Sequence, residues 1–370
     1  MAAQTAPRTT TTRAAMTAAD DLARLAAVLR EEAGPGLTFM EVCGTHTMAI
    51  ARYGLRQLLP AGVRLISGPG CPVCVTAMAD LDRVLALARL PEVTLVTFGD
   101  LIRVPASRGT LAAERAAGAD VRVVYSPSDA VRIAAAEPER QVVFAGIGFE
   151  TTAPTTAAAL LEARAAGLSN FSLLSLHKTM PLPLRALLDL GETPVSGFLL
   201  PGHVSVITGT ACYEFLARDY GIAGVVAGFE ARDVLEALLM LVRQPEPGIA
   251  IQYTRAVRPE GNVVAQRLLE QVFEPSDADW RGLGVIPGSG LALRAGFADA
   301  DAARRFTVDP GPTLEPPGCR CGEVLRGVTD PADCALFGAR CTPEDPVGAC
   351  MVSSEGACAA RYRYRGLDDA

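Results

Sequence analysis

Ten cysteines are the most reactive groups of this 370-residue chain, and most of them fall into two clusters. Structural zinc sites usually use paired C-x₂₋₄-C hooks, which the C-terminal cluster lacks, and no histidine lies nearby. Single, well-separated thiolates better suit a [4Fe–4S] cluster held by four cysteines, which leaves two for a disulfide pair. Zinc or a set of plain disulfides is the alternative. The C-terminal cluster consists of Cys319, Cys321, Cys334, Cys341, Cys350 and Cys358.

Two glycine-containing loops carry the other thiols that could do chemistry. Cys43 opens a CGTHT segment before a helical pattern, and a helix N-terminus lowers a thiol pKa and favours the thiolate. His46 could serve there as hydrogen-bond partner, base or ligand, although a plain strand-to-helix turn is equally compatible. Cys71 and Cys74 form a C-x-x-C pair in GPGCPVC, typical of a redox dithiol whose first thiol is exposed. Half of a metal site and a purely structural loop are the alternatives, and Cys212 is expected to be a buried packing cysteine.

Apolar runs alternating with helical patterns must position these loops. Runs at 37–42, 63–67 and 93–98 each lead through a glycine-containing loop into a helical pattern. This alternation predicts an α/β fold with parallel sheets covered on both faces. An amphipathic helix is expected at 17–33, packed on the C-terminal domain, after a disordered tail at 1–16.

The strand–loop–helix pattern repeats along the chain. Three later segments resemble three earlier ones in the same order, although shared α/β features alone could produce such matches. The pairs are 37–47 with 141–152, 64–76 with 197–209, and 95–105 with 224–235. The repetition predicts two related α/β domains at 34–125 and 126–240, followed by a cysteine-rich iron–sulfur domain at 241–370.

The same alignment suggests where the functional groups meet. His203 falls opposite Cys71, and the Glu150 segment falls opposite the His46 segment. Structural histidines are the alternative for His203 and for His177. If the two domains face each other, one cleft would gather a set of candidate catalytic groups. These are Cys43, His46, Cys71, Cys74, Glu150 and His203.

Composition limits the class of protein. A formal charge of −7 and a pI near 5.2 argue against nucleic-acid binding and against an anionic membrane surface. No apolar run is long enough for a transmembrane helix, and the first 16 residues lack the apolar core of a secretory signal. We therefore expect a cytoplasmic protein whose thiols serve metal binding or redox chemistry. No nucleotide-binding fingerprint is present.

Together these motifs resemble the HypD family of hydrogenase formation proteins. The resemblance covers nearly the whole chain beyond the N-terminal tail. The family's cluster pattern, C-x₁₄-C-x₆-C-x₁₆-C, is supplied by Cys319, Cys334, Cys341 and Cys358, which leaves Cys321 and Cys350 as a pair. The matching motifs are CGTHT (43–47), GPGCPVC (68–74), FGDLIRVP (98–105), GFETT (148–152), PGHVS (201–205) and PEGN (259–262).

The resemblance implies a [NiFe] hydrogenase maturation factor, which is a scaffold with redox activity rather than a stand-alone enzyme. With a HypC-type chaperone and a HypE-type cyanide donor it would assemble the Fe(CN)₂CO group, being a monomer before complex formation. Cys43 would share the iron with a chaperone thiolate, with His46 close by and the Cys71/Cys74 dithiol beside it. The [4Fe–4S] cluster and the Cys321/Cys350 pair would supply electrons. The alternative is a thiol–disulfide oxidoreductase similar to ferredoxin–thioredoxin reductases, which would not need Cys43.

Overall fold

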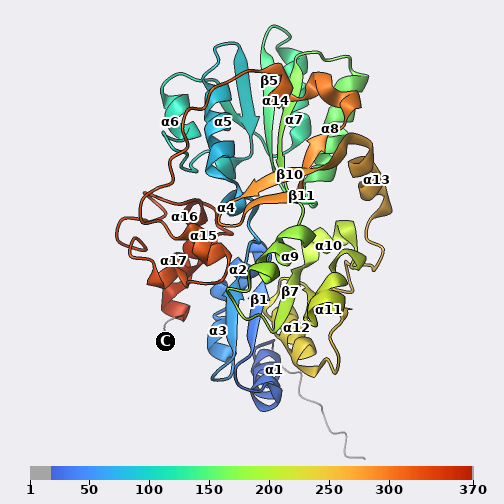
Figure 1. Cartoon of the computed structure of the whole chain (residues 1–370), viewed down its shortest axis with the longest axis vertical. Coiled ribbons are helices and arrows are strands. Elements are labelled where there is room, and N and C mark those ends of the chain that lie inside the picture. The colour runs from blue at the N-terminus through green and yellow to red at the C-terminus, as the bar shows by residue number, and fades with distance from the viewer. Residues whose placement is uncertain (1–17, 369–370) are drawn as a thin grey trace, which may run out of the picture.

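Two parallel β-sheets form the frame of the computed structural model, which describes residues 18–368, and they lie one above the other in Figure 1. The four-stranded sheet has the order β4-β3-β5-β6 and the five-stranded sheet the order β2-β1-β7-β8-β9. The predicted α/β class with parallel sheets is confirmed. The strands are β1 (Thr38–Glu41), β2 (Arg64–Ser67), β3 (Val93–Thr97), β4 (Val121–Val123), β5 (Gln141–Gly148), β6 (Phe171–His177), β7 (Gly197–Pro201), β8 (Ala223–Ala227) and β9 (Ile249–Ile251).

Helices cover both faces of the sheets, so the central strands are apolar on both sides. In β5, Val142 and Phe144 belong to a core cluster shared with α7 and α8, whereas Val143 and Ala145 belong to the cluster shared with α5. The alternation follows from the two-residue period of a strand. The helices up to the end of the second sheet are α1 (Ala18–Glu32), α2 (Gly44–Arg52), α3 (Leu55–Leu58), α4 (Pro72–Val75), α5 (Met78–Ala88), α6 (Leu111–Ala116), α7 (Pro127–Ala136), α8 (Ala153–Ala165), α9 (Pro181–Leu190), α10 (Gly202–Thr208), α11 (Phe215–Tyr220) and α12 (Ala231–Arg243).

The sheets divide the chain differently from the expected boundary at 125–126. The chain leaves the five-stranded sheet after β2, builds the whole four-stranded sheet from β3 to β6, and then returns at β7, which pairs with β1. Segments 64–76 and 197–209, expected in different domains, therefore supply β2 and β7 of one sheet, on the two sides of β1. Local similarity of strand–loop–helix units cannot reveal which sheet each strand joins, because that choice depends on long-range pairing.

The N-terminal helix is confirmed as α1, but it packs on α12 rather than on the cysteine-rich region. Its contacts with α12 include the ion pair of Glu32 with Arg243, at 2.6 Å. Apolar side chains of α1 join the core cluster on this side of the five-stranded sheet, so burial explains the position. The tail expected at residues 1–16 lies outside the described residues.

The region expected as one domain at 241–370 has three parts. β9 completes the five-stranded sheet, and an antiparallel hairpin then lies between the two sheets (Figure 1). The cysteine-rich part follows, and its last helix packs on α2. The elements are α13 (Val263–Val272), β10 (Phe273–Trp280), β11 (Gly284–Leu293), α14 (Ala302–Arg305), α15 (Cys321–Leu325), α16 (Ala349–Val352) and α17 (Ala357–Asp368).

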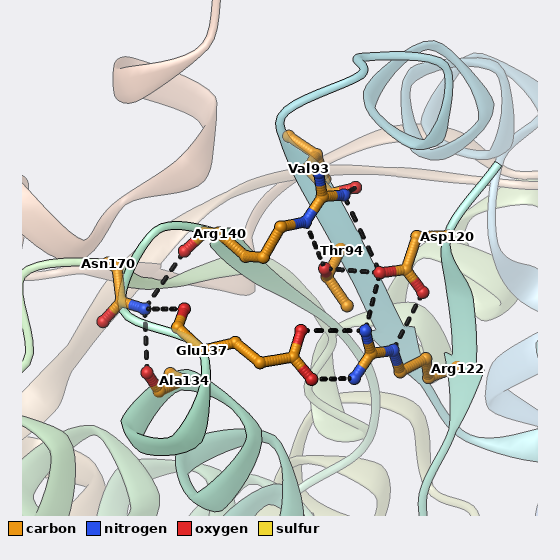
Figure 2. A network of polar contacts seen from close by, with 8 residues as sticks. All are labelled: Val93, Thr94, Asp120, Arg122, Ala134, Glu137, Arg140 and Asn170. Atoms are coloured by element: carbon orange, nitrogen blue, oxygen red, sulfur yellow. Dashed lines mark hydrogen bonds and ion pairs between the residues drawn. The ribbon is translucent and has the colours of Figure 1, made fainter.

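A network of polar contacts closes the amino edge of the four-stranded sheet (Figure 2). Arg122 donates to both carboxylate oxygens of Asp120 and to both of Glu137, at 2.6–2.9 Å. The side-chain amide of Asn170 donates to three backbone carbonyls, those of Ala134, Glu137 and Arg140. The network ties the end of α7 to the starts of three strands.

Among residues 18–368, no helix combines the length and the apolar character needed to cross a membrane.

Candidate functional site

A cavity of about 460 Å³ lies where the carboxyl ends of the two sheets meet. Ligands of parallel α/β sheets bind at this end of the strands, because the loops that follow the strands converge there. The five-stranded sheet contributes the loops after β1, β2 and β7, and the four-stranded sheet those after β3, β4 and β5. The residues that line the cavity include Cys43, Gly70, His203, Phe98, Tyr125 and Phe149.

Cys43 is the N-cap residue of α2 and lies in the wall of this cavity, with 8% of its surface exposed. Its amide donates a hydrogen bond to the buried carboxylate of Glu41, at 3.0 Å. The second glycine-rich loop packs directly on it, since a Cβ atom at Gly70 would come within 2.2 Å of the Cys43 nitrogen. The amide of Gly44 donates to the Gly70 carbonyl at 2.9 Å. Both predicted thiol loops therefore meet at one point.

The environment of the Cys43 thiol opposes its ionisation. Burial, followed by the nearby carboxylates of Glu355 and Glu41, raises the pKa of Cys43 to about 12. The expectation that the helix N-terminus favours a thiolate is therefore wrong, because loss of solvation outweighs the helix dipole. A bound metal cation would reverse this balance, because thiolate–metal bonding displaces the proton.

His46 and His203 both lie against the ring of Phe229. The ring of His203 stacks on Phe229 with centroids 3.9 Å apart, and that of His46 lies 4.9 Å from Phe229. His46 is fully buried, and its Nε2 donates to the carbonyl of Gly228 at 2.9 Å, which leaves Nδ1 as an acceptor. Nδ1 has no hydrogen-bond partner in the described part of the chain. Burial lowers the pKa of His46 to about 4, so this imidazole is neutral.

Cys71 and Cys74 form a disulfide across α4, and both are buried. The expectation of an exposed first thiol is therefore wrong in this oxidised state. The helix predicted to continue from this motif breaks after one turn, at Thr76, and restarts as α5 at Met78. At this break the carboxyl end of β10 reaches the chain through the bridge of Thr76 with Trp280.

Glu150 is buried beside the cavity and does not line it. Its Oε1 accepts a hydrogen bond from the Met180 amide at 3.0 Å, whereas Oε2 has no partner among the described residues. Burial raises the pKa of Glu150 to about 7.

Cys212, expected to be buried, is only partly buried, and burial raises the pKa of its thiol to about 11. Of the six groups expected in one cleft, Cys43 and His203 line the cavity, and the other four are buried around it.

The C-terminal cysteines gather at a second place. Five of them line one small apolar pocket, and Cys350 is fully buried but does not belong to that lining. Interactions with the neighbouring thiols of Cys319 and Cys350 raise the pKa of Cys321, and the interaction with Cys358 opposes this rise. Within residues 18–368 no three His, Cys, Asp or Glu side chains adopt a metal-coordinating arrangement. The five lining cysteines are Cys319, Cys321, Cys334, Cys341 and Cys358.

Comparison with known proteins identifies the family. The family model HypD, described as "Hydrogenase formation hypA family", matches residues 18–365. The chain belongs to the HypD family. The hydrogenase maturation factor HypD of Rhizobium leguminosarum bv. viciae is 51% identical over 357 residues, which cover 94% of this chain and 92% of that protein. The factors of that name from Cupriavidus necator and Escherichia coli are each 48% identical, covering 94% and 89% of this chain and 95% and 89% of their own lengths.

The resemblance found in the sequence is thus confirmed, and the chain is a hydrogenase maturation factor of the HypD family. The comparisons give no support to a thiol–disulfide reductase of the ferredoxin–thioredoxin reductase type.

Glu355 is a site residue of this HypD-family chain that the sequence analysis missed. It lines the cavity, and one carboxylate oxygen accepts a hydrogen bond from Thr45 at 2.8 Å. Its side chain lies over Gly44, where a Cβ atom would come within 2.5 Å of it. Burial raises the pKa of Glu355. The two hydrogen-bonded residues are 310 positions apart, so only the fold places this carboxylate beside Cys43.

Asp100 and Tyr125 also line the cavity without having been predicted. Asp100 lies within the FGDLIRVP motif, which offered a signal that the sequence analysis left unused. Tyr125 is 97% exposed at the end of β4, and nothing in its sequence context distinguished it.

Proposed function

We propose that this chain is the scaffold on which the Fe(CN)₂CO group of [NiFe] hydrogenase is assembled, with Cys43 as the protein ligand of the substrate iron. The observation that carries the proposal is the position of Cys43 in the wall of the cavity between the two sheets. A soft thiolate suits iron carrying strong-field ligands. Because the thiol is protonated when no cation is bound, binding of iron would be coupled to release of its proton.

The groups around Cys43 fit a ligand-bearing metal. His203 lines the cavity, and neutral His46, hydrogen-bonded to the Gly228 carbonyl, lies with its ring centroid 4.9 Å from that of Phe229. The amide of Cys43 is fixed by Glu41, which limits motion of the loop. His203 and Glu355 would orient or protonate the ligands of the iron at the cavity wall, whereas neutral His46 would orient the site from behind the wall. Glu150 would act from a buried position beside it.

The C-terminal thiols would hold a [4Fe–4S] cluster through Cys319, Cys334, Cys341 and Cys358. The chemistry of the donor set supports this assignment, since five thiols and apolar side chains enclose one pocket. Such a cluster supplies single electrons when bound. In this proposal Cys321 and Cys350 form the second thiol pair.

The contacts between helices support an electron path from these cysteines to the cavity. α16, which contains Cys350, and α15, which begins at Cys321, both contact α4, which carries Cys74. α4 in turn follows Gly70, which packs on Cys43. The thiol pairs would then form a path between the pocket and the cavity. Reduction of the Cys71–Cys74 disulfide to two thiols takes two electrons and two protons, and oxidation of the Cys321 and Cys350 thiols to a disulfide would supply both within the chain.

The partners and location belong to the same proposal. A HypC-type chaperone would share the iron through its own thiolate, and a HypE-type protein would deliver cyanide. Both would act on a cytoplasmic monomer. The exposed ring of Tyr125 at the cavity gives such a partner an aromatic surface to contact.

The test is Cys43→Ala, compared with the matched control Cys212→Ala. Cys43→Ala should abolish infrared bands of iron-bound CN and CO in the protein isolated with its chaperone, and it should abolish hydrogenase maturation in cells. The iron and sulfide of the C-terminal site should remain, and stability should change by roughly 1 kcal/mol or less. Cys212→Ala should retain the bands. Maturation of hydrogenase by the Cys43→Ala protein would refute the scaffold role.

A further inference from the structure

Arg281 is a buried arginine at the junction of the two thiol-bearing regions. It follows β10 directly, and its side chain is 5% exposed. Its backbone amide donates to the carbonyl of Val75 at 2.8 Å, and a terminal guanidinium nitrogen donates to the carbonyl of Thr76 at 3.0 Å. Both carbonyls belong to the end of α4, the helix that carries the Cys71–Cys74 disulfide. Arg281 is thus anchored to the disulfide helix.

The positive charge and the N–H donors of the Arg281 guanidinium are only partly paired with groups of the chain. Its ion pair with Glu315, at 3.1 Å, reaches a carboxylate that is 62% exposed and therefore largely solvated. The Nε–H group is buried and has no hydrogen-bond partner among residues 18–368. An unpaired donor on a buried charge is costly, so such a group is expected to meet an acceptor in the working protein.

The backbone next to Arg281 lies against the cysteine-rich segment. Gly282 packs on Gly322, since a Cβ atom at Gly282 would come within 2.5 Å of the Gly322 Cα atom. Gly322 follows Cys321 at the start of α15, and α15 also contacts α4, to which Arg281 is hydrogen-bonded. The buried guanidinium therefore lies where α4 and the cysteine-bearing helix α15 meet.

We propose that Arg281 is a positioning residue for the cofactor of the cysteine pocket, donating its Nε–H to a cofactor or cysteine sulfur and holding a positive charge beside it. The inference rests on the proposed [4Fe–4S] cluster. Hydrogen bonds to sulfur and nearby charge set the reduction potential of such clusters. Because reduction adds negative charge in a poorly solvated site, a fixed cation favours the reduced state.

The test uses the full chain, isolated without oxygen, and measures iron content and the midpoint potential of the cluster. Arg281→Met removes the charge and the donor at similar length, and Arg281→Lys keeps the charge. Arg294→Met, in the same hairpin, is the matched control, because Arg294 is 46% exposed and pairs with Glu274 at a distance of 3.9 Å. The Arg281→Met protein should keep its iron. Reduction of its cluster should be about tenfold less favourable, which lowers the midpoint potential by about 59 mV for one electron. Arg281→Lys should stay within about threefold of the wild type, and Arg294→Met should be unchanged.

The outcomes separate this inference from the proposed function. Full iron content and an unchanged potential in Arg281→Met would refute the role of Arg281 and leave the cluster intact. If the Arg281→Met protein loses iron, the Arg281→Lys protein distinguishes the two explanations. Iron retained by Arg281→Lys with the wild-type midpoint potential supports the role of the charge. Loss of iron from Arg281→Lys as well shows that Arg281 only holds the hairpin against α4. Wild-type protein without iron would overturn the cluster itself, and the inference with it.

Discussion

The two edges of the four-stranded sheet are made from the same strands but differ in how far their polar side chains are hydrogen-bonded. At the amino edge, Arg122 has two carboxylate partners and the amide of Asn170 donates to three carbonyls (Figure 2). At the carboxyl edge, one oxygen of Glu150 is buried without a partner in the described residues. Across the cavity from this edge, His46 has the same kind of unpaired atom.

The difference separates stability from function within one sheet. Paired polar groups at the amino edge join strands and a helix, and they need nothing from outside the chain. Unpaired buried groups cost free energy, so each of them calls for an explanation such as a ligand or a proton. Ser172, near the amino edge, has an unpaired buried hydroxyl, but only the carboxyl edge has an unpaired carboxylate oxygen, that of Glu150, among the described residues. This carboxylate lies beside the cavity, which Cys43 of the five-stranded sheet also lines.

The largest effect should come from breaking the amino edge. Asn170→Ala removes one side chain that serves the carbonyls of Ala134, Glu137 and Arg140, and Asn170 is 6% exposed. Leaving buried carbonyls unpaired should lower the free energy of unfolding by about 3–4 kcal/mol. Urea unfolding of the full chain measures the change.

Asn262→Ala is the matched control for this prediction. Asn262 is the N-cap of α13 and lies in a more exposed place, where its side chain accepts hydrogen bonds from two helix amides. Its loss should therefore be about 1 kcal/mol. Equal losses in both variants would show that the amino edge has no special stabilising role.

At the carboxyl edge, Glu150→Gln should change how stability depends on pH. The folded pKa of about 7 lies above the ordinary value of 4.5, so the folded state keeps a proton that the unfolded state loses between these values. Wild-type stability should therefore be greatest at low pH in this window and fall as pH rises to about 7, by roughly 2–3 kcal/mol. Glu150→Gln should lack this fall, because the amide does not ionise. Parallel curves from pH 4.5 to 8, measured by urea unfolding, would contradict the burial of an ionisable Glu150.

The sequence predicted the elements of this fold better than their assembly. The runs at 37–42, 63–67 and 93–98 became β1, β2 and β3. β1 and β3 are buried along their whole length, which explains their apolar sequences, whereas β2 is an edge strand and only Leu65 in it is buried. The assignment of β2 and β7 to one sheet could not be predicted, since the similarity between their segments describes each unit and not its neighbours.

For the candidate site, the predictable part was the chemistry of local motifs. Cys43 and His203 were both expected in one cleft, and both line the cavity. The direction of the Cys43 pKa could not be predicted, because it depends on burial and on Glu355, which comes from the far end of the chain. The burial of Cys71 was missed for the same reason, since the packing around α4 comes from distant elements.

The smallest effect should come from Arg122→Met at the amino edge. Arg122, Asp120 and Glu137 are each about one third exposed, so solvent screens their ion pairs, and the loss should be only about 1 kcal/mol despite four short contacts. Hydrogen bonds from Arg122 lower the pKa of Asp120 and of Glu137, so this stabilisation is present above the ordinary carboxyl pKa and is lost as pH falls below it. The difference between wild type and Arg122→Met should therefore shrink at acid pH and also at 1 M salt, where the screening length is about 3 Å. Because Asn170 acts through neutral hydrogen bonds, the effect of Asn170→Ala should persist at that salt concentration. A loss in Arg122→Met that is as large as that of Asn170→Ala and insensitive to salt would show that the charged half of the network, rather than Asn170, holds this edge together.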